Sequence, residues 1–196
     1  MKRIDDAWQF TPDWSEDFLK GENEYEEIRI PHTVKEYPLH YIDVNSYQMI
    51  CGYRRHLKIH DLNKRYFLQF DGAAHIATVY VNGKNMFFHE CGYTSFRVEI
   101  TNAIHEGDNL ICVKLNTKED ASIPPFGFMI DYLTYGGIYR HVWLDEKEST
   151  YIKDVFVQPL SDLKSITSSI TYDGDTTNMH VKTQIFDQEH ICVVQK

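Results

Sequence analysis

Hydrophobic and polar residues alternate with a period of two along much of the chain after residue 52. In the segment 65–71, for example, this spacing would place Tyr66, Leu68 and Phe70 on one face. Such alternation is typical of a β-strand with one buried face. It predicts strands at 53–59, 65–71, 76–81, 96–100 and 110–115. No convincing amphipathic helix separates them, so the pattern indicates an all-β fold, a β-sandwich or jelly roll, with helix limited to a turn or two.

The dipeptide Asn82-Gly83 stands between two apolar, strand-like runs. Both central positions of a type I′ turn need positive φ, which asparagine and glycine accept most readily. The sequence therefore predicts a hairpin in which residues 79–81 pair back with residues 85–89.

Residues 1–50 show no sustained period and carry turn chemistry at several prolines. Their large apolar residues, such as Trp8 and Phe10, are isolated from one another. We interpret this part as an arm that lies over the core. Its acidic run, residues 22–27, is expected to be a solvated face without a function of its own.

The segment 123–144 has the most unusual composition, with adjacent prolines, three glycines, several aromatics and one acid, Asp131. Pro124 and Pro125 exclude helix and central strand, and Gly136-Gly137 permits a bend. Residues 138–144 alternate again and predict a strand. A loop of this kind that holds an acid among aromatic residues is typical of the rim of a polar ligand site. A packed loop whose aromatics plug the sheet is the alternative.

The composition changes after residue 144, where 145–150 is charged and lacks apolar residues. We interpret this stretch as a linker. Beyond it, 152–157, 166–172 and 179–186 predict further strands. A complete immunoglobulin-like sandwich needs about seven strands. The sequence thus predicts a β-sandwich domain at 1–148 and a partial immunoglobulin-like sandwich at 149–196, with the chain ending inside the second domain.

Charge and motifs exclude several function classes. The formal charge of −9 disfavours nucleic acid as a partner. No segment has the roughly 20 apolar residues of a membrane helix, and the N-terminus does not have the pattern of a secretory signal. The sequence has no nucleophile elbow or phosphate-binding loop. We therefore expect no membrane association and no catalytic residue that can be named from a motif.

The cysteines are too scattered for a disulfide framework or a metal knuckle, and they lie at Cys51, Cys91, Cys112 and Cys192. His89 with Cys91 is the nearest approach to a ligand pair, but a second pair is missing. We expect reduced thiols in a cytoplasmic protein, with no metal and no cofactor.

Seven short sequence blocks resemble those of a known family and occur in the same order as in that family. The blocks are Ile30-Pro31-His32, Gly52 to Arg55, Phe67 to Ala73, Val79 to Gly83, His89 to Phe96, Glu106 to Leu110, and Tyr135 to Arg140. Over residues 1–150 this arrangement resembles the N-terminal sugar-binding domain of glycoside hydrolase family 2, which includes β-galactosidases, β-glucuronidases and β-mannosidases. Residues 151–196 are similar to the start of the immunoglobulin-like domain that follows. The sequence around 123–140 is most similar to that of bacterial β-galactosidase-like members. Cys91 stands where the family commonly has glycine.

The resemblance implies a galactose-binding-like jelly roll whose loop reaches over a (β/α)8 barrel in the same polypeptide. That barrel carries both catalytic glutamates of a retaining mechanism and is not among these residues. We therefore expect a non-catalytic part of a β-galactosidase-like enzyme, inactive alone. Its expected partners are a β-galactoside-like carbohydrate, the barrel and neighbouring subunits of a homo-oligomer.

The resemblance also implies roles for particular residues. Asp131 corresponds to an aspartate that hydrogen-bonds sugar hydroxyls; the alternative is that it caps a turn. Tyr135 and Tyr132 would flank the sugar or pack the loop. Asn45 or Gln48 could add a second sugar contact. Gly136, Gly137 and Arg140 are expected to hold the loop, with Arg140 using its guanidinium fork.

Two other functions remain open at this point. An autonomous carbohydrate-binding module would bind sugar without a barrel. A structural domain would serve only assembly, through apolar surface that a barrel or subunit covers.

Overall fold

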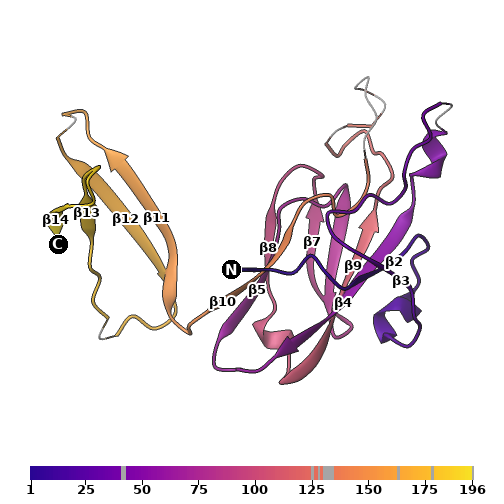
Figure 1. The fold of residues 1–196 in the computed structure, drawn as a ribbon, viewed down its shortest axis with the longest axis horizontal. Coiled ribbons are helices and arrows are strands. Elements are labelled where there is room, and N and C mark those ends of the chain that lie inside the picture. The colour runs from indigo at the N-terminus through magenta and orange to yellow at the C-terminus, as the bar shows by residue number, and fades with distance from the viewer. Residues whose placement is uncertain are drawn as a thin grey trace. The chain divides into compact units, whose positions relative to one another are not determined.

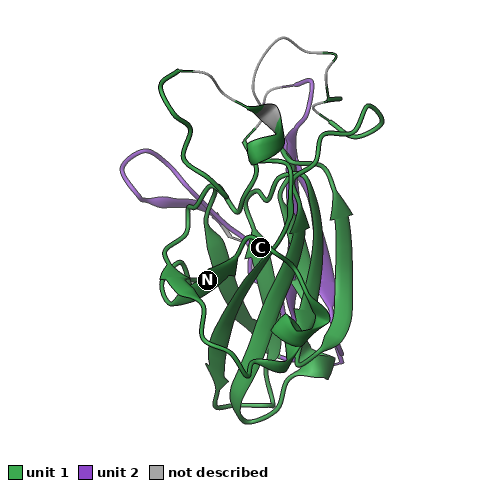
Figure 2. Ribbon diagram, turned by 90° about the vertical axis from the view of Figure 1, so that its right-hand side faces the viewer, with its two compact units in different colours: residues 1–148 green, residues 149–196 purple. Residues whose placement is uncertain are grey.

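A computed structural model describes residues 1–40, 43–124, 126–127, 129, 135–162, 164–177 and 179–195 (Figure 1). Within these residues the regular structure is β-strand apart from three short 3-10 helices, so the predicted all-β class is confirmed. The chain forms two compact units, Met1–Glu148 and Ser149–Lys196 (Figure 2).

The larger sheet of the first unit has six antiparallel strands. In sheet order they are β3 (Glu26–Ile28), β2 (Trp8–Thr11), β4 (Ile50–Ile59), β9 (Gly107–Asn116), β6 (Ile76–Val81) and β7 (Lys84–Glu90). The long pair β4 and β9 runs in register from Ile50 opposite Asn116 to Ile59 opposite Gly107. This pair forms the centre of the sheet.

The second sheet has four antiparallel strands in the order β1 (Lys2–Arg3), β10 (Val142–Lys147), β5 (Arg65–Phe70) and β8 (Phe96–Glu99). Its strands come from both ends of the unit, since Lys2 pairs with Leu144 and Leu144 pairs with Leu68. The two sheets share one apolar core, which confirms the predicted β-sandwich.

The core follows the alternation in the sequence. Along β6 the residues Ala77, Val79 and Val81 are fully buried, while the residues between them are partly exposed. Leu68 and Phe70 of β5 face the same core from the other sheet. Burying a side chain of this size contributes about 1.5–3 kcal/mol, so the alternating face is what holds the sheets together.

The predicted hairpin is confirmed. Asn82 has φ of 50° and Gly83 has φ of 78°, as a type I′ turn requires. Strand β7 pairs with β6 along its length, with a bulge near Val79 and Tyr80.

The N-terminal arm does more than lie over the core. It supplies β1, β2 and β3 to the sheets, and the 3-10 helix η1 (Glu16–Lys20) follows β2. Two more such helices, η2 (Val44–Ser46) and η3 (Thr101–Ala103), lie in connections. The strands of the arm were not predicted because each is short and pairs with residues far away in the sequence.

The interpretation of 145–150 as a linker was wrong for its first half. Residues 145–147 continue β10 and pair with residues 65–67 of β5. Asp145 is buried, and its Oδ2 accepts a hydrogen bond of 2.8 Å from the Arg97 guanidinium. Because its charge is paired, this acid fits inside the sandwich. Residues 148–150 alone connect β10 to the next strand.

The second unit consists of two antiparallel ribbons. β11 (Tyr151–Pro159) pairs with β12 (Ile166–Asp173), and β13 (Gln184–Phe186) pairs with β14 (Cys192–Gln195). The predicted strand at 179–186 is shorter than expected, and β14 was not predicted. Val155, Val157 and Ile166 remain about half exposed. The immunoglobulin-like class of this unit stays a prediction.

Candidate functional site

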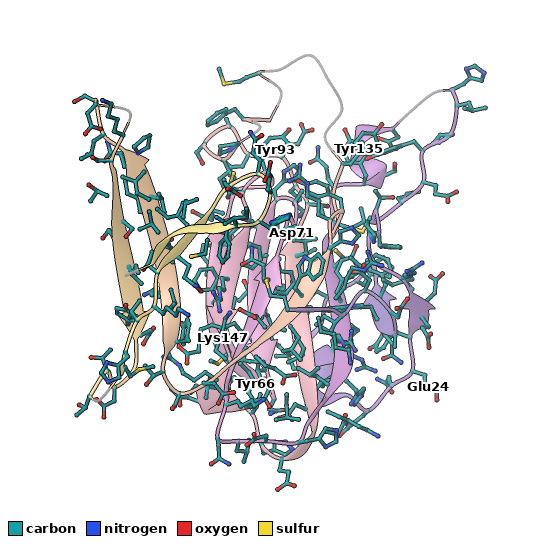
Figure 3. All side chains as sticks on the ribbon, turned by 60° about the vertical axis from the view of Figure 1, so that its left-hand side comes forward. Glu24, Tyr66, Asp71, Tyr93, Tyr135 and Lys147 are labelled. Atoms are coloured by element: carbon teal, nitrogen blue, oxygen red, sulfur yellow. The ribbon has the colours of Figure 1, made fainter. Side chains whose placement is uncertain are left out.

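The connections between strands meet at one end of the sandwich, which we call the loop end. Ile50, Asn116, Ile76 and Glu90 lie opposite one another on four adjacent strands. The described residues beyond them, 43–49, 117–124, 135–137, 71–75 and 91–95, therefore emerge at the same edge. Tyr135 and Tyr93 lie at this end, whereas Tyr66 and Lys147 lie towards the opposite one (Figure 3). The described residues 123–124 and 135–137 of the segment with the unusual composition thus belong to the loop end.

The residue predicted to bind the sugar, Asp131, lies outside the described residues, as does Tyr132. The described residues on either side establish how the loop is attached to the sandwich. On one side it leaves β9 at Thr117, and on the other it returns at Tyr135 to Gly137.

Gly137 fastens the returning end of the loop. Its N–H donates to the Ala74 carbonyl at 3.1 Å, and its carbonyl accepts from the Ala74 N–H at 3.0 Å. Its φ is +136°, and a Cβ there would lie 2.3 Å from the His32 carbonyl oxygen. Glycine is therefore required here both by backbone conformation and by the close approach of another segment. The position agrees with the predicted role of Gly137 in holding the loop.

Gly136 lies directly against Thr117, where the loop begins. A Cβ on Gly136 would be 2.4 Å from the Thr117 Cβ. The Thr117 hydroxyl donates to the Tyr47 carbonyl at 2.7 Å and accepts from the Met49 N–H at 3.0 Å. The two ends of the loop thus meet at one buried threonine, which also fixes the segment before β4.

Three tyrosines line the loop end. The Tyr37 ring contacts the rings of Tyr47 and Tyr135, with centroids 5.1 and 4.9 Å apart. Burial raises the pKa of Tyr37 to about 12, and Tyr47, Tyr135 and Glu119 add to the shift. Tyr135 itself is 53% exposed, so it packs on one side and faces solvent on the other. The arrangement allows both roles that the sequence left open for Tyr135.

Asn45 lies in η2, two residues before Tyr47. Its backbone N–H and its side-chain amide both donate to Asp43 Oδ1, at 2.9 and 3.1 Å. Its side chain is exposed. Gln48 is partly buried and forms no side-chain hydrogen bond within the described residues. Both lie at the loop end, and their part in sugar binding stays a prediction.

Arg140 contacts the ring of its neighbour. Its guanidinium carbon lies 5.6 Å from the Tyr139 centroid, and the Tyr139 hydroxyl donates to the Gly92 carbonyl at 2.5 Å. No hydrogen bond joins the Arg140 guanidinium to a described residue. Within those residues, Tyr139 rather than Arg140 connects this segment to the loop after β7.

His75 occupies an unusual environment at the loop end. It is only 4% exposed, and neither ring nitrogen has a hydrogen-bond partner among the described residues. Burial lowers the pKa of the imidazole, and Glu119 partly opposes this. A buried polar group without a partner costs about 1–3 kcal/mol. Without such a partner, His75 is expected to lower the stability of the sandwich.

The substitution His75→Leu is expected to raise the free energy of unfolding by about 1–2 kcal/mol, because it removes the unpaired polar group. It should also reduce the pH dependence. A histidine with a lowered folded-state pKa binds its proton more readily when unfolded, so its contribution is complete above about pH 6.5 and is lost as pH falls. Urea titrations at pH 7.5 and 5.5 test both expectations.

The exposed His60→Leu serves as the control for this substitution and should change stability by less than about 0.5 kcal/mol. A loss of stability in His75→Leu at pH 7.5 would contradict the inference that the imidazole lacks a partner. Since burial also lowers the pKa of His32, part of the pH dependence should remain.

The sequence analysis missed several residues that the fold brings to this end: Tyr37, Tyr47, His75, Thr117 and Glu119. In the sequence, Tyr37 stands in an irregular region directly before Pro38, and Thr117 and Glu119 follow a predicted strand. Their proximity depends on the register between β4, β9 and β6, which no local pattern reveals. The loss of alternation at strand ends was the only available signal.

Two features of the described residues bear on other functions. They contain no group of three or more His, Cys, Asp or Glu side chains placed to hold a metal ion. Nor does the described part of the chain include a helix that is long and apolar enough to cross a membrane. The four cysteines are free, and burial raises the pKa of Cys51 and Cys112 to about 12.

Comparison with known proteins identifies the family. Residues 4–148 match the family model described as "Glycosyl hydrolases family 2, sugar binding domain". The chain belongs to glycoside hydrolase family 2. The resemblance inferred from the seven blocks is therefore confirmed, and the matched residues cover the β-sandwich with its loop end. A β-galactosidase of Thermoanaerobacter pseudethanolicus is 35% identical over 195 residues, which cover 94% of this chain and 26% of that protein.

Solved structures agree on the fold of this family 2 chain. A β-glucuronidase of an uncultured Clostridium species covers the whole chain with a TM-score of 0.85 and 22% identity, over 37% of its own length. A putative β-galactosidase of Bacteroides fragilis also covers the whole chain, with a TM-score of 0.76 and 27% identity, over 32% of its length. The chain thus spans well under half the length of the relatives that it matches.

Proposed function

We propose that this family 2 domain binds the terminal sugar of a β-galactoside-like substrate at its loop end and does not itself break the glycosidic bond. The observation that carries the proposal is that Thr117 and Gly137 hold the two described ends of the loop beside the contacting rings of Tyr37, Tyr47 and Tyr135. The match to a sugar-binding domain supports the ligand class.

In this proposal Asp131 supplies the principal contact. A carboxylate accepts hydrogen bonds from two adjacent hydroxyls at once, and such charge-assisted bonds are stronger than neutral ones. Tyr135, half exposed above Tyr37, offers a ring face for the apolar side of the sugar. The aromatic anchor limits the orientations of the sugar, and the carboxylate selects its hydroxyl pattern.

Catalysis is proposed to come from a (β/α)8 barrel that supplies an acid/base and a nucleophilic glutamate. A retaining mechanism needs two carboxyl groups about 5–5.5 Å apart on either side of the scissile bond. In this proposal the domain positions the substrate, and the barrel and neighbouring subunits complete the enzyme.

The 196-residue chain is expected not to hydrolyse a chromogenic β-galactoside and to bind methyl β-galactoside weakly. Asp131→Asn should weaken that binding about 10- to 100-fold, because a hydrogen bond to a charged group contributes about 1.5–3 kcal/mol. Titration calorimetry measures the affinity, and absorbance of the released chromophore measures turnover.

Glu36→Gln is the matched control, since it removes one exposed carboxylate from the segment beside Tyr37. It should bind like the unmodified chain. Turnover by the chain alone, or an affinity indifferent to Asp131→Asn, would refute the proposal.

A further inference from the structure

The outer face of the six-stranded sheet has a hollow of about 270 Å³. It is lined by side chains of four strands, namely Ile50, Ile76, Thr78, Phe88, Lys114 and Asn116. The register explains why they gather, since Thr78 lies between Lys114 and Phe88, and Ile76 lies next to Asn116. The hollow is therefore a property of the rigid sheet rather than of a loop.

One wall of the hollow is an aromatic ring turned towards solvent. Phe88 is 54% exposed on β7, the edge strand of the sheet. Together with the partly buried Ile76 and Ile50 it forms an apolar floor and side. A phenyl ring offers an apolar face, and the C–H groups of a sugar ring are the part of a carbohydrate that can pack on it.

The opposite side of the hollow is polar and has free hydrogen-bonding capacity. Within the described residues, the Thr78 hydroxyl and the Asn116 amide nitrogen have no hydrogen-bond partner, and the Lys114 ammonium has no carboxylate partner. Asn116 Oδ1 accepts from the Lys118 N–H at 3.0 Å, which fixes the orientation of the amide. One hydroxyl, one amide and one ammonium group are thus available to a ligand.

The position of the ammonium group is also defined. Lys114 Nζ lies 5.6 Å from the centroid of the Trp14 ring, and that ring stacks on Tyr80 with centroids 5.8 Å apart. Such a cation–π contact restrains the long side chain before a ligand arrives. Less conformational entropy is then lost on binding.

We propose that this hollow is a second saccharide-binding site, which takes one pyranose ring against Phe88 with its hydroxyls on Thr78 and Asn116. Lys114 favours a ring that carries a carboxylate. The volume is below the roughly 300–1,000 Å³ of sites for drug-sized ligands, so it suits a single ring. The formal charge of −9 disfavours a polyanion such as nucleic acid. The site does not involve Asp131, so it goes beyond the proposed function.

The test follows backbone amides by NMR while methyl β-glucuronide or methyl β-galactoside is added to the isotopically labelled chain. Saturable shifts are expected at Thr78, Lys114 and Asn116, with millimolar dissociation constants for so small a ligand. The glucuronide should bind about five-fold more tightly, as expected for one exposed ion pair. The same shifts should persist in Asp131→Asn, which separates this site from the loop end.

Two variants and one control test which side chains of the hollow contact the sugar. Phe88→Ala should weaken binding at these amides at least about ten-fold, whereas Phe156→Ala, an equally exposed phenylalanine of the other unit, should not. Lys114→Met should abolish the preference for the glucuronide and keep the galactoside. The inference is wrong if these amides do not move at about 50 mM sugar. It is also wrong if they move with protein concentration alone, because the face would then bind a second copy of the chain.

Discussion

Gly137→Ala is expected to lower the free energy of unfolding of the sandwich by about 3 kcal/mol or more. A φ of +136° is accessible to glycine and costs a side-chained residue about 1–3 kcal/mol. The new Cβ would also lie 2.3 Å from the His32 carbonyl oxygen, which belongs to the backbone and is held in place, because the His32 N–H donates to the Ile138 carbonyl at 2.9 Å. Relief of the clash must therefore disturb the contact that fastens the loop.

Gly83→Ala is the matched control for this prediction. Gly83 has φ of +78°, but a Cβ there meets nothing within 4 Å. Its replacement should cost only the conformational penalty, about 1–2 kcal/mol. Tryptophan fluorescence during urea unfolding is suitable for both, since Trp8, Trp14 and Trp143 all lie in the first unit. Equal losses in the two variants would show that the close approach to His32 contributes nothing.

Arg54→Met is expected to destabilise the sandwich by about 3–5 kcal/mol, because it removes a buried cation on which several groups depend. The guanidinium of Arg54, 2% exposed, donates to Gln9 Oε1 at 2.7 Å, to the Phe18 carbonyl at 3.2 Å and to the Asn23 carbonyl. Its guanidinium carbon also lies over the rings of Phe18 and Tyr25, 4.8 and 4.7 Å from their centroids. Without it, three acceptors lose their donor and the η1 segment loses its attachment to β4.

Arg140→Met provides the comparison, because Arg140 is exposed and its contact is with the Tyr139 ring. We expect a change of less than about 0.5 kcal/mol in the same urea titration. A large effect there would support the predicted role of Arg140 in holding the loop. A small effect of Arg54→Met would show that the arm is held by its strands alone.

The local signals in the sequence predicted the local structure well. The alternation of β6 and the dipeptide Asn82-Gly83 specify a strand and a turn within a few residues, and both are present. The segment 145–147 was misassigned because its charges suggested solvent. The fold instead pairs Asp145 with Arg97, a partner that lies far away in the sequence.

The candidate site could be predicted only in part. The composition of 123–144 and the family resemblance pointed to a loop, and the structure attaches the described ends of that loop at the loop end. The attachment of that loop to Thr117 and the environment of His75 depend on strand register. Register is decided by long-range pairing of β4, β9 and β6, and single-strand patterns carry no information on it.

The outer hollow and the loop end differ in how they are built. The hollow is formed by side chains in regular strands, whereas the loop end is formed by connections that meet at Thr117 and Gly137. Sites on strands are positioned more precisely than sites on loops. If both bind saccharide, the domain can hold a sugar at a fixed point on the sheet while the loop end adapts to a second one.

The pairing of Lys2 with Leu144 has a consequence for synthesis on the ribosome. Strand β1 is made before β10 and has no strand partner until β10 has been made. Strand β5 can pair with β8 earlier, but its other edge stays unpaired until β10 has been made. Long-range pairing of this kind is slow and leaves strand edges exposed. The four-stranded sheet is therefore expected to close late during translation, and a ribosome that stalls before residue 142 would display an open, aggregation-prone sandwich.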